Sequence, residues 1–220
     1  MQLPLILTNF KTYQSATGKS ALELAKIHAK IAEETGQNIA VAVQAFDLAN
    51  IAQNTKIPAF AQQIDSATYG SFTGWNLAES AKEAGAYGTI LNHSEHRISF
   101  EILEKSIQRA KEVGLKTVVC AETAEEAKEI MDKFSPDLVA VEPPELIGGD
   151  ISVSTANPEI IRDAVNLIGK GKVLVGAGIK NGKDVKIAIE LGAVGVLLAS
   201  GITKAKDPEA VLRDLCSGLN

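Results

Sequence analysis

One carboxylate stands where it could take a proton from a bound molecule. Glu142 directly follows Leu138–Val141, four apolar residues that predict a buried strand. Beyond it, Pro143-Pro144 stiffens the chain and Gly148-Gly149 loosens it, because proline fixes φ and glycine leaves it free. A loop with one stiff and one flexible hinge suits a lid that closes over a catalytic base. Taken alone, an ordinary turn after a strand explains the same residues.

Four other segments also place polar side chains or glycines directly after apolar runs. They are Asn9-Phe10-Lys11, Asn92-His93-Ser94-Glu95, Gly176-Ala177-Gly178 and Ala199-Ser200-Gly201. A lysine and a histidine can stabilise negative charge that develops on a substrate, and small residues let backbone N–H groups approach an anion. Each segment alone has a simpler explanation: a solvated lysine, a structural histidine, a glutamate that only pairs with the lysine, or a plain turn. Their shared position is the informative feature.

Neither a metal nor a nucleotide cofactor is expected. His93 and His96 suggest a metal pair at first, but their spacing is not typical of one and no third ligand is evident. No Gly-x-Gly-x-x-Gly segment follows an apolar run, and no Walker loop occurs. The candidate side chains would therefore act by proton transfer and electrostatic stabilisation alone.

Eight apolar, β-branched runs alternate with stretches of helical spacing. The runs are Leu3–Thr8, Ile39–Val43, Ala59–Gln62, Gly88–Leu91, Lys116–Cys120, Asp137–Val141, Lys172–Gly176 and Gly195–Ala199. Two helical stripes are formed by Leu22, Ala25, Ala29 and Ala32 and by Ile102, Leu103, Ile107 and Ala110. Three junctions between a helix and the next strand contain a glycine (Gly85, Gly114 and Gly192), as a left-handed helix cap requires.

These runs predict an α/β fold with parallel strands. Continuous apolar runs, in place of alternation, indicate strands that are buried on both faces. Eight strand–helix units that close on themselves form a (β/α)8 TIM barrel, here a single domain over residues 1–220. A doubly wound open sheet is the alternative, because periodicity does not report closure. In a barrel, the residues that follow the strands gather at one end, so the five polar segments should converge.

Composition is that of a globular chain without specialised partners. The apolar share is 45%, the charged share is 22%, and the net charge of −5 argues against nucleic acid as the main partner. Cys120 and Cys216 lie in apolar stretches, which favours buried thiols over a disulfide. No apolar run reaches membrane length and no signal-peptide pattern precedes the first strand, so we expect a cytoplasmic protein without a membrane partner.

Taken together, the five segments resemble the triosephosphate isomerase family in order and in type. The resemblance rests on Asn9-x-Lys11, Asn92-His93-Ser94-Glu95, Val141-Glu142-Pro143-Pro144-Glu145, Gly176-Ala177-Gly178 and Leu198-Ala199-Ser200. It covers Leu5 to about Gly218, and the short chain with its Pro-Pro-Glu-Leu-Ile-Gly segment is similar to the compact archaeal branch of the family. The family interconverts dihydroxyacetone phosphate and D-glyceraldehyde 3-phosphate through an enediolate, in glycolysis and gluconeogenesis.

The resemblance implies a role for each candidate residue. Glu142 is the base, His93 the electrophile, and the Lys11 ammonium stabilises negative charge, with Glu95 in support. Substrate contacts fall to Asn9, Lys11, Ile147, Gly148, Gly178, Ala199 and Ser200. Gly70–Gly74, with Thr73, is similar to the loop that enters a neighbouring subunit in this family, which implies a homo-oligomer, a tetramer in preference to a dimer.

Two other classes of function stay open on the residues alone. A different phosphate-binding barrel enzyme, such as an aldolase-type lyase or an indole-glycerol-phosphate-type synthase, would need a Schiff-base lysine or a Lys–Glu acid/base pair, and Lys11 is the available lysine. A non-catalytic phosphosugar-binding protein could keep the same pocket. The presence of Lys11, His93 and Glu142 together argues against that second class.

Overall fold

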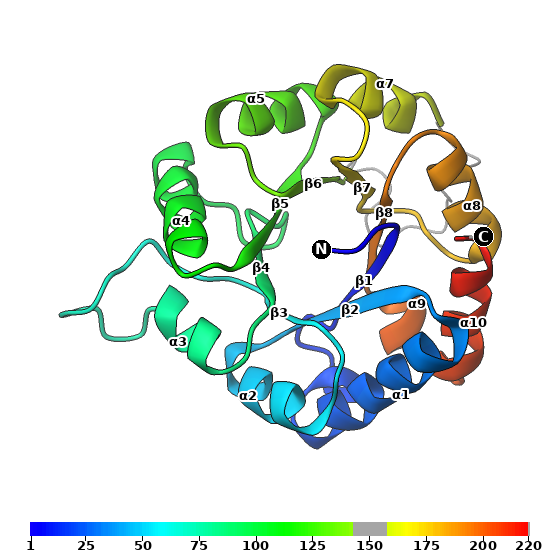
Figure 1. Ribbon diagram of the computed structural model, residues 1–220, viewed down its shortest axis with the longest axis horizontal. Helices are drawn as coiled ribbons and strands as arrows, with labels where there is room; N and C mark the ends of the chain where they lie inside the picture. Colours follow the sequence, from blue (N-terminus) through cyan, green and yellow to red (C-terminus); the bar gives the residue numbers. More distant parts are fainter. Residues whose placement is uncertain (143–157, 220) are drawn as a thin grey trace.

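Eight parallel strands close into a barrel in chain order, from β1 to β8 and back to β1 (Figure 1). The computed structural model describes residues 1–142 and 158–219. The strands are β1 (Leu5–Asn9), β2 (Asn38–Val43), β3 (Ala59–Ala61), β4 (Gly88–Leu91), β5 (Lys116–Ala121), β6 (Leu138–Val141), β7 (Val173–Val175) and β8 (Gly195–Leu198). Closure confirms the predicted (β/α)8 barrel and excludes the doubly wound open sheet.

Helices surround the barrel as an outer ring (Figure 1). They are α1 (Lys19–Thr35), α2 (Ala45–Asn54), α3 (Ala78–Glu83), α4 (Phe100–Glu112), α5 (Ala124–Phe134), α7 (Pro158–Ile168), α8 (Gly182–Glu190), α9 (Ser200–Thr203) and α10 (Pro208–Ser217), with a 3-10 turn η1 (Gln14–Ala16) before α1. Within the described ranges, no helix has both the length and the apolar character needed to cross a bilayer.

Each strand contributes alternate residues to two separate apolar clusters. Residues such as Leu7, Phe60 and Leu174 fill the barrel interior, together with side chains from all of the remaining strands. The residues between them, such as Val41 and Val139, pack outward against the helices. Because both faces of the strands are buried, the sequence shows continuous apolar runs and not alternation.

The predicted glycine junctions are confirmed. Helices α3, α4 and α8 end at Glu83, Glu112 and Glu190, and the glycines that follow have φ of +93°, +74° and +99°. At Gly192 an added Cβ would also lie 2.9 Å from Val165 Cγ1. A side chain would therefore be strained there in two ways, by its backbone conformation and by its neighbour.

The structure differs from the predicted pattern in two details. Strand β1 begins at Leu5 and not at Leu3, because Pro4 has no N–H to donate to a ladder. The fully buried face of α1 is Ala21, Leu24, Ala25, His28 and Ile31, whereas Leu22, Ala29 and Ala32 of the predicted stripe pack against the same core only partly buried. Helix α1 carries apolar residues on more than one side, so its packing partners decide which side is buried.

Candidate active site

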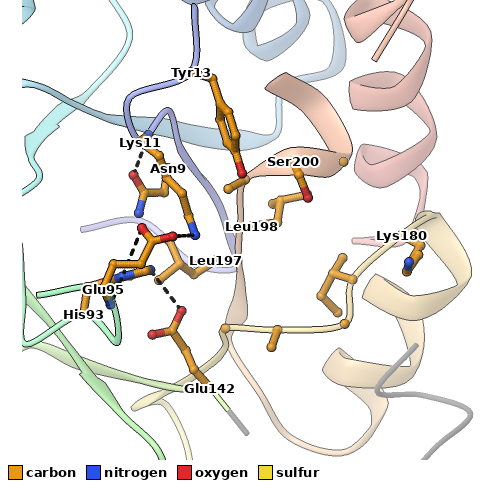
Figure 2. A pocket seen from close by; sticks show the side chains of 16 residues that line it. Asn9, Lys11, Tyr13, His93, Glu95, Glu142, Lys180, Leu197, Leu198 and Ser200 are labelled. Carbon is orange, nitrogen blue, oxygen red and sulfur yellow. Dashed lines mark hydrogen bonds and ion pairs between the residues drawn. The ribbon is translucent and has the colours of Figure 1, made fainter. Parts of the chain in front are cut away.

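The ends of five strands meet around one pocket of about 270 Å³ (Figure 2). Strands β1, β4 and β6 bring Asn9, Lys11, His93, Glu95 and Glu142 to one side, and the segments after β7 and β8 bring Gly178, Ala199 and Ser200 to the other. The predicted convergence is therefore confirmed for these residues. Ile147 and Gly148 lie outside the described residues, and Thr73 is not part of this pocket.

Glu142 lies buried at the tip of β6. Its backbone N–H donates to Ala121 O at 2.8 Å, and only 4% of the residue is exposed. Gly176 makes room for the side chain, since an added Cβ there would lie 2.3 Å from Glu142 Cγ. Carboxylate oxygen Oε2 is buried without a hydrogen-bond partner among the described residues. A buried carboxylate with a free acceptor is suited to taking up a proton.

His93 points one ring nitrogen at this carboxylate. Its Nε2 lies 3.4 Å from Glu142 Oε1, while its Nδ1 accepts a hydrogen bond from the Glu95 N–H at 3.1 Å. An acceptor nitrogen carries no proton, so the neutral ring holds its proton on Nε2. The ring therefore presents an N–H donor to the pocket, as an electrophile for a carbonyl oxygen requires.

Lys11 is held in a fixed position after β1. Its backbone has a φ of +47°, and its N–H donates to Asn9 Oδ1 at 3.0 Å. The ammonium lies 2.7 Å from Glu95 Oε1, which is the ion pair suggested by the sequence. The lysine side chain is 17% exposed and the glutamate 59%, so the positive charge faces the pocket while its partner reaches solvent. Such an ammonium can stabilise an anion in the pocket.

Sequence reasoning missed Gln62, which follows β3. Its amide Nε2 donates to Asn9 Oδ1 at 3.2 Å and to Lys11 O at 2.9 Å. It thereby orients both residues of the first strand tip. Its position in the sequence could have identified it. Like Lys11, His93 and Glu142, Gln62 is a polar residue at the end of an apolar run.

Tyr13 and Lys180 also line the pocket and were not predicted (Figure 2). Tyr13 lies just before η1, and its ring is 4.8 Å from the ammonium of Lys204, a cation–π distance. Both residues follow strand tips at a distance of several positions. A search limited to the first residues after each strand could not find them.

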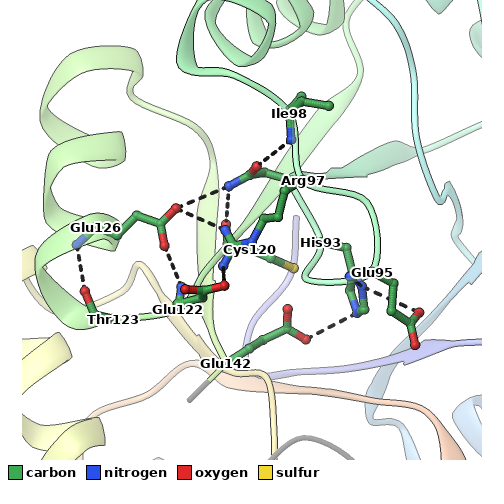
Figure 3. A network of polar contacts seen from close by, with 10 residues as sticks. His93, Glu95, Arg97, Ile98, Cys120, Glu122, Thr123, Glu126 and Glu142 are labelled. Carbon is green, nitrogen blue, oxygen red and sulfur yellow. Dashed lines mark hydrogen bonds and ion pairs between the residues drawn. The ribbon is translucent and has the colours of Figure 1, made fainter. Parts of the chain in front are cut away.

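The cysteines are buried thiols, as expected. Cys120 projects into the barrel interior near Glu142 (Figure 3). Burial, and then the nearby carboxylate of Glu142, raise the pKa of the Cys120 thiol well above its usual range. The thiol therefore stays neutral beside the Glu142 carboxylate and adds no second negative charge to the site.

The profile of the triosephosphate isomerase family matches residues 4–217 of this chain. The chain belongs to the triosephosphate isomerase family. It is 49% identical over 215 residues to the triosephosphate isomerase of Methanocaldococcus jannaschii, with 96% of this chain and 98% of that protein covered. It is 46% identical over 219 residues to that of Methanosarcina barkeri, with 98% of each chain covered.

A solved structure supports the same fold. Triosephosphate isomerase from Bartonella henselae superposes with a TM-score of 0.68 and covers 89% of this chain and 92% of its own. Its sequence identity of 21% makes it evidence for the barrel alone. The archaeal relatives agree with the resemblance to the compact archaeal branch of the triosephosphate isomerase family.

Proposed function

We propose that this chain is a triose-phosphate isomerase that interconverts dihydroxyacetone phosphate and D-glyceraldehyde 3-phosphate. Membership of the family supports the reaction. The observation that carries the proposal at the site is the pairing of a buried carboxylate, Glu142, with a histidine whose proton points to the same place. One group can take a proton from carbon while the other donates a hydrogen bond to the neighbouring oxygen.

The reaction needs a base and an electrophile side by side. Glu142 removes the weakly acidic proton from the carbon next to the carbonyl, and the electrons move into an enediolate. The N–H of His93 hydrogen-bonds the carbonyl oxygen as negative charge develops there, and the Lys11 ammonium stabilises the same charge. Return of the proton from Glu142 to the adjacent carbon completes the isomerisation. The former carbonyl oxygen gains a proton and becomes the hydroxyl group, while the original hydroxyl oxygen loses its proton and becomes the new carbonyl, so the isomerisation balances without an oxidant.

The phosphate end of the substrate would lie against the segments after β7 and β8. Gly178, Ala199 and Ser200 line this side of the pocket with small side chains, which let an anion approach the backbone. Ile147 and Gly148 complete the proposed contacts as part of a lid that keeps water out. A barrel lyase or synthase is less well supported, because Glu142 lies 3.4 Å from His93 and, within residues 1–142 and 158–219, forms no ion pair with a lysine.

A coupled assay on glyceraldehyde 3-phosphate, with chelator present and no added cofactor, tests the proposal. The wild-type protein should isomerise the substrate, and Glu142→Gln should lower kcat by about 10²–10⁴-fold or more, because the amide keeps the shape but does not accept the proton. Glu104→Gln is the matched control, since Glu104 is an exposed residue of α4 outside the pocket. Near-normal kcat in Glu142→Gln, or activity that requires a divalent ion, would contradict the mechanism.

We also propose that the protein is a cytoplasmic homo-oligomer, a tetramer in preference to a dimer. The loop between β3 and α3 projects away from the helix ring (Figure 1). It carries Tyr69, Phe72 and Trp75, which are 71%, 42% and 50% exposed, and Phe46 on α2 is 97% exposed. Clustered exposed aromatic side chains favour a surface that a second copy covers.

A further inference from the structure

Beside the active site, a polar network joins the turn after β4 to the start of α5 (Figure 3). We propose that Asn92, Arg97 and Glu126 form a clamp that positions His93 for catalysis. The three residues do not line the pocket, so they would act through the histidine and not on the substrate. The inference rests on the proposed function, because it assigns a catalytic task to His93.

Asn92 is the centre of the clamp. It is a non-glycine residue with a φ of +59°, and only 2% of it is exposed. Its Nδ2 donates to Cys120 O of β5 at 3.1 Å, and its Oδ1 accepts from the Ile98 N–H at 3.2 Å. One amide therefore ties the end of β4 to the neighbouring strand and also closes the turn from Asn92 to Ile98. Such fully used buried amides specify a single local structure.

Arg97 and Glu126 connect the turn after β4 to the start of α5. Arg97 Nη1 lies 3.0 Å from Glu126 Oε1, and its Nη2 lies 2.9 Å from Glu122 Oε1. Glu126 Oε1 is also 3.4 Å from Asn92 Nδ2, and its Oε2 accepts from the Glu122 N–H at 2.7 Å. The side chains of Arg97 and Glu126 are 28% and 25% exposed, so the pair is partly shielded from water. The turn is thereby anchored to the N-terminus of α5.

The closed turn sets the geometry of His93. The ring nitrogen Nδ1 accepts from the Glu95 N–H, and the His93 carbonyl accepts from the His96 N–H at 2.8 Å. Both donors lie within the segment that Asn92 and Arg97 hold in place. If the turn loosened, the Glu95 N–H would leave Nδ1, and the ring could carry its proton on either nitrogen. The clamp thus controls both the position of the ring and the placement of its proton.

Loss of the clamp should lower kcat more than it changes KM. His93 Nε2 and Glu142 Oε1 are 3.4 Å apart, and a misplacement of 1 Å at a reacting group can cost about 10²-fold in rate. The proposed phosphate contacts come from the segments after β7 and β8, which the clamp does not touch. We expect kcat to fall about 10–100-fold, with KM within about threefold of wild type.

Two variants and one control test this. Asn92→Gly removes the amide but tolerates the left-handed φ. Glu126→Gln keeps the volume but removes one of the two carboxylate charges that hold Arg97. Ser135→Gly is the matched control, because Ser135 is an exposed non-glycine residue with a φ of +48° at the end of α5, away from the pocket. Steady-state kinetics should show reduced kcat in the first two variants and wild-type values in the control.

The ¹⁵N NMR shifts of the His93 ring give a readout that general destabilisation would not move. Wild type should show one proton-bearing and one acceptor nitrogen, and each clamp variant should show the two shifts drawn together by exchange between tautomers. Wild-type kcat with unchanged ring shifts in both variants would overturn the clamp. An inactive wild type would refute the proposed function alone, since the ring shifts report the clamp without any substrate.

Discussion

Replacing Gly176 with alanine should damage catalysis out of proportion to one methyl group. The new Cβ would lie 2.3 Å from Glu142 Cγ, 3.3 Å from Glu142 Cδ and 3.1 Å from Val141 O. Carbon atoms in contact are normally about 3.5–4.0 Å apart. The overlap with Cγ therefore exceeds about 1 Å. Val141 O is a backbone atom and is also tightly approached at 3.1 Å, so we expect the glutamate side chain to be the group that moves.

The size of the effect follows from that displacement. Moving a reacting group by about 1 Å can cost about 10²-fold in rate, so we expect kcat to fall by about that factor. Overpacking of this kind costs about 1–3 kcal/mol of stability. For a chain of this length each kcal/mol lowers Tm by about 2–4 °C, so the protein should still be folded at assay temperature.

Steady-state kinetics and thermal unfolding of the same samples separate the two effects. Gly192→Ala is the control, because its Cβ would lie 2.9 Å from Val165 Cγ1 and its φ is +99°, yet it lies between α8 and β8, outside the pocket. It should lower Tm and leave kcat of the folded protein unchanged. A Gly176→Ala variant with kcat within about twofold of wild type would show that the position of Glu142 does not limit the reaction.

Two further predictions concern stability and assembly. Burial lowers the pKa of His28 from 6.5 to about 4 in the folded state. As pH falls from 6.5 to 4, His28 takes up a proton in the unfolded chain but not in the folded protein, and the folded state loses stability. Read in the direction of rising pH, the free energy of unfolding should increase by about 3 kcal/mol from pH 4 to 6.5 and then level off. Denaturant titrations of His28→Gln should lack this rise, and an equal slope in both proteins would refute the assignment. Replacing Gly70–Gly74 by two glycines should leave the barrel folded but give a smaller, poorly active species by light scattering, whereas an unchanged mass would refute the proposed interface.

The order of residue types along the chain is enough to predict where the candidate site residues lie. Continuous apolar runs separated by glycine-terminated helices require parallel strands, and the ends of parallel strands all face the same way. Polar residues directly after those runs, such as Lys11, His93 and Glu142, therefore had to lie at one end of the sheet. Local order along the chain was enough for this inference, because it depends only on the direction of the strands.

Closure of the barrel was decided by the tertiary structure. The pairing of β8 with β1 joins residues almost two hundred positions apart, such as Leu5 and Gly195, and no local pattern reports it. The buried face of α1 was decided in the same way. Its apolar residues lie on several sides, and the side that packs inward carries His28, whose Nδ1 donates to Leu24 O at 2.8 Å and whose Nε2 accepts from the Thr8 hydroxyl at 3.0 Å.

The protonation and orientation of the site residues also came from hydrogen bonds that only the folded chain forms. The N–H of Glu95 assigns the proton of His93 to Nε2, and Gln62 orients the first strand tip from 53 positions away. Glu126 reaches Asn92 across 34 positions. Residue type and strand position predict which groups are present, because those are local properties. Their protonation, orientation and support depend on atoms that only folding brings within hydrogen-bond distance.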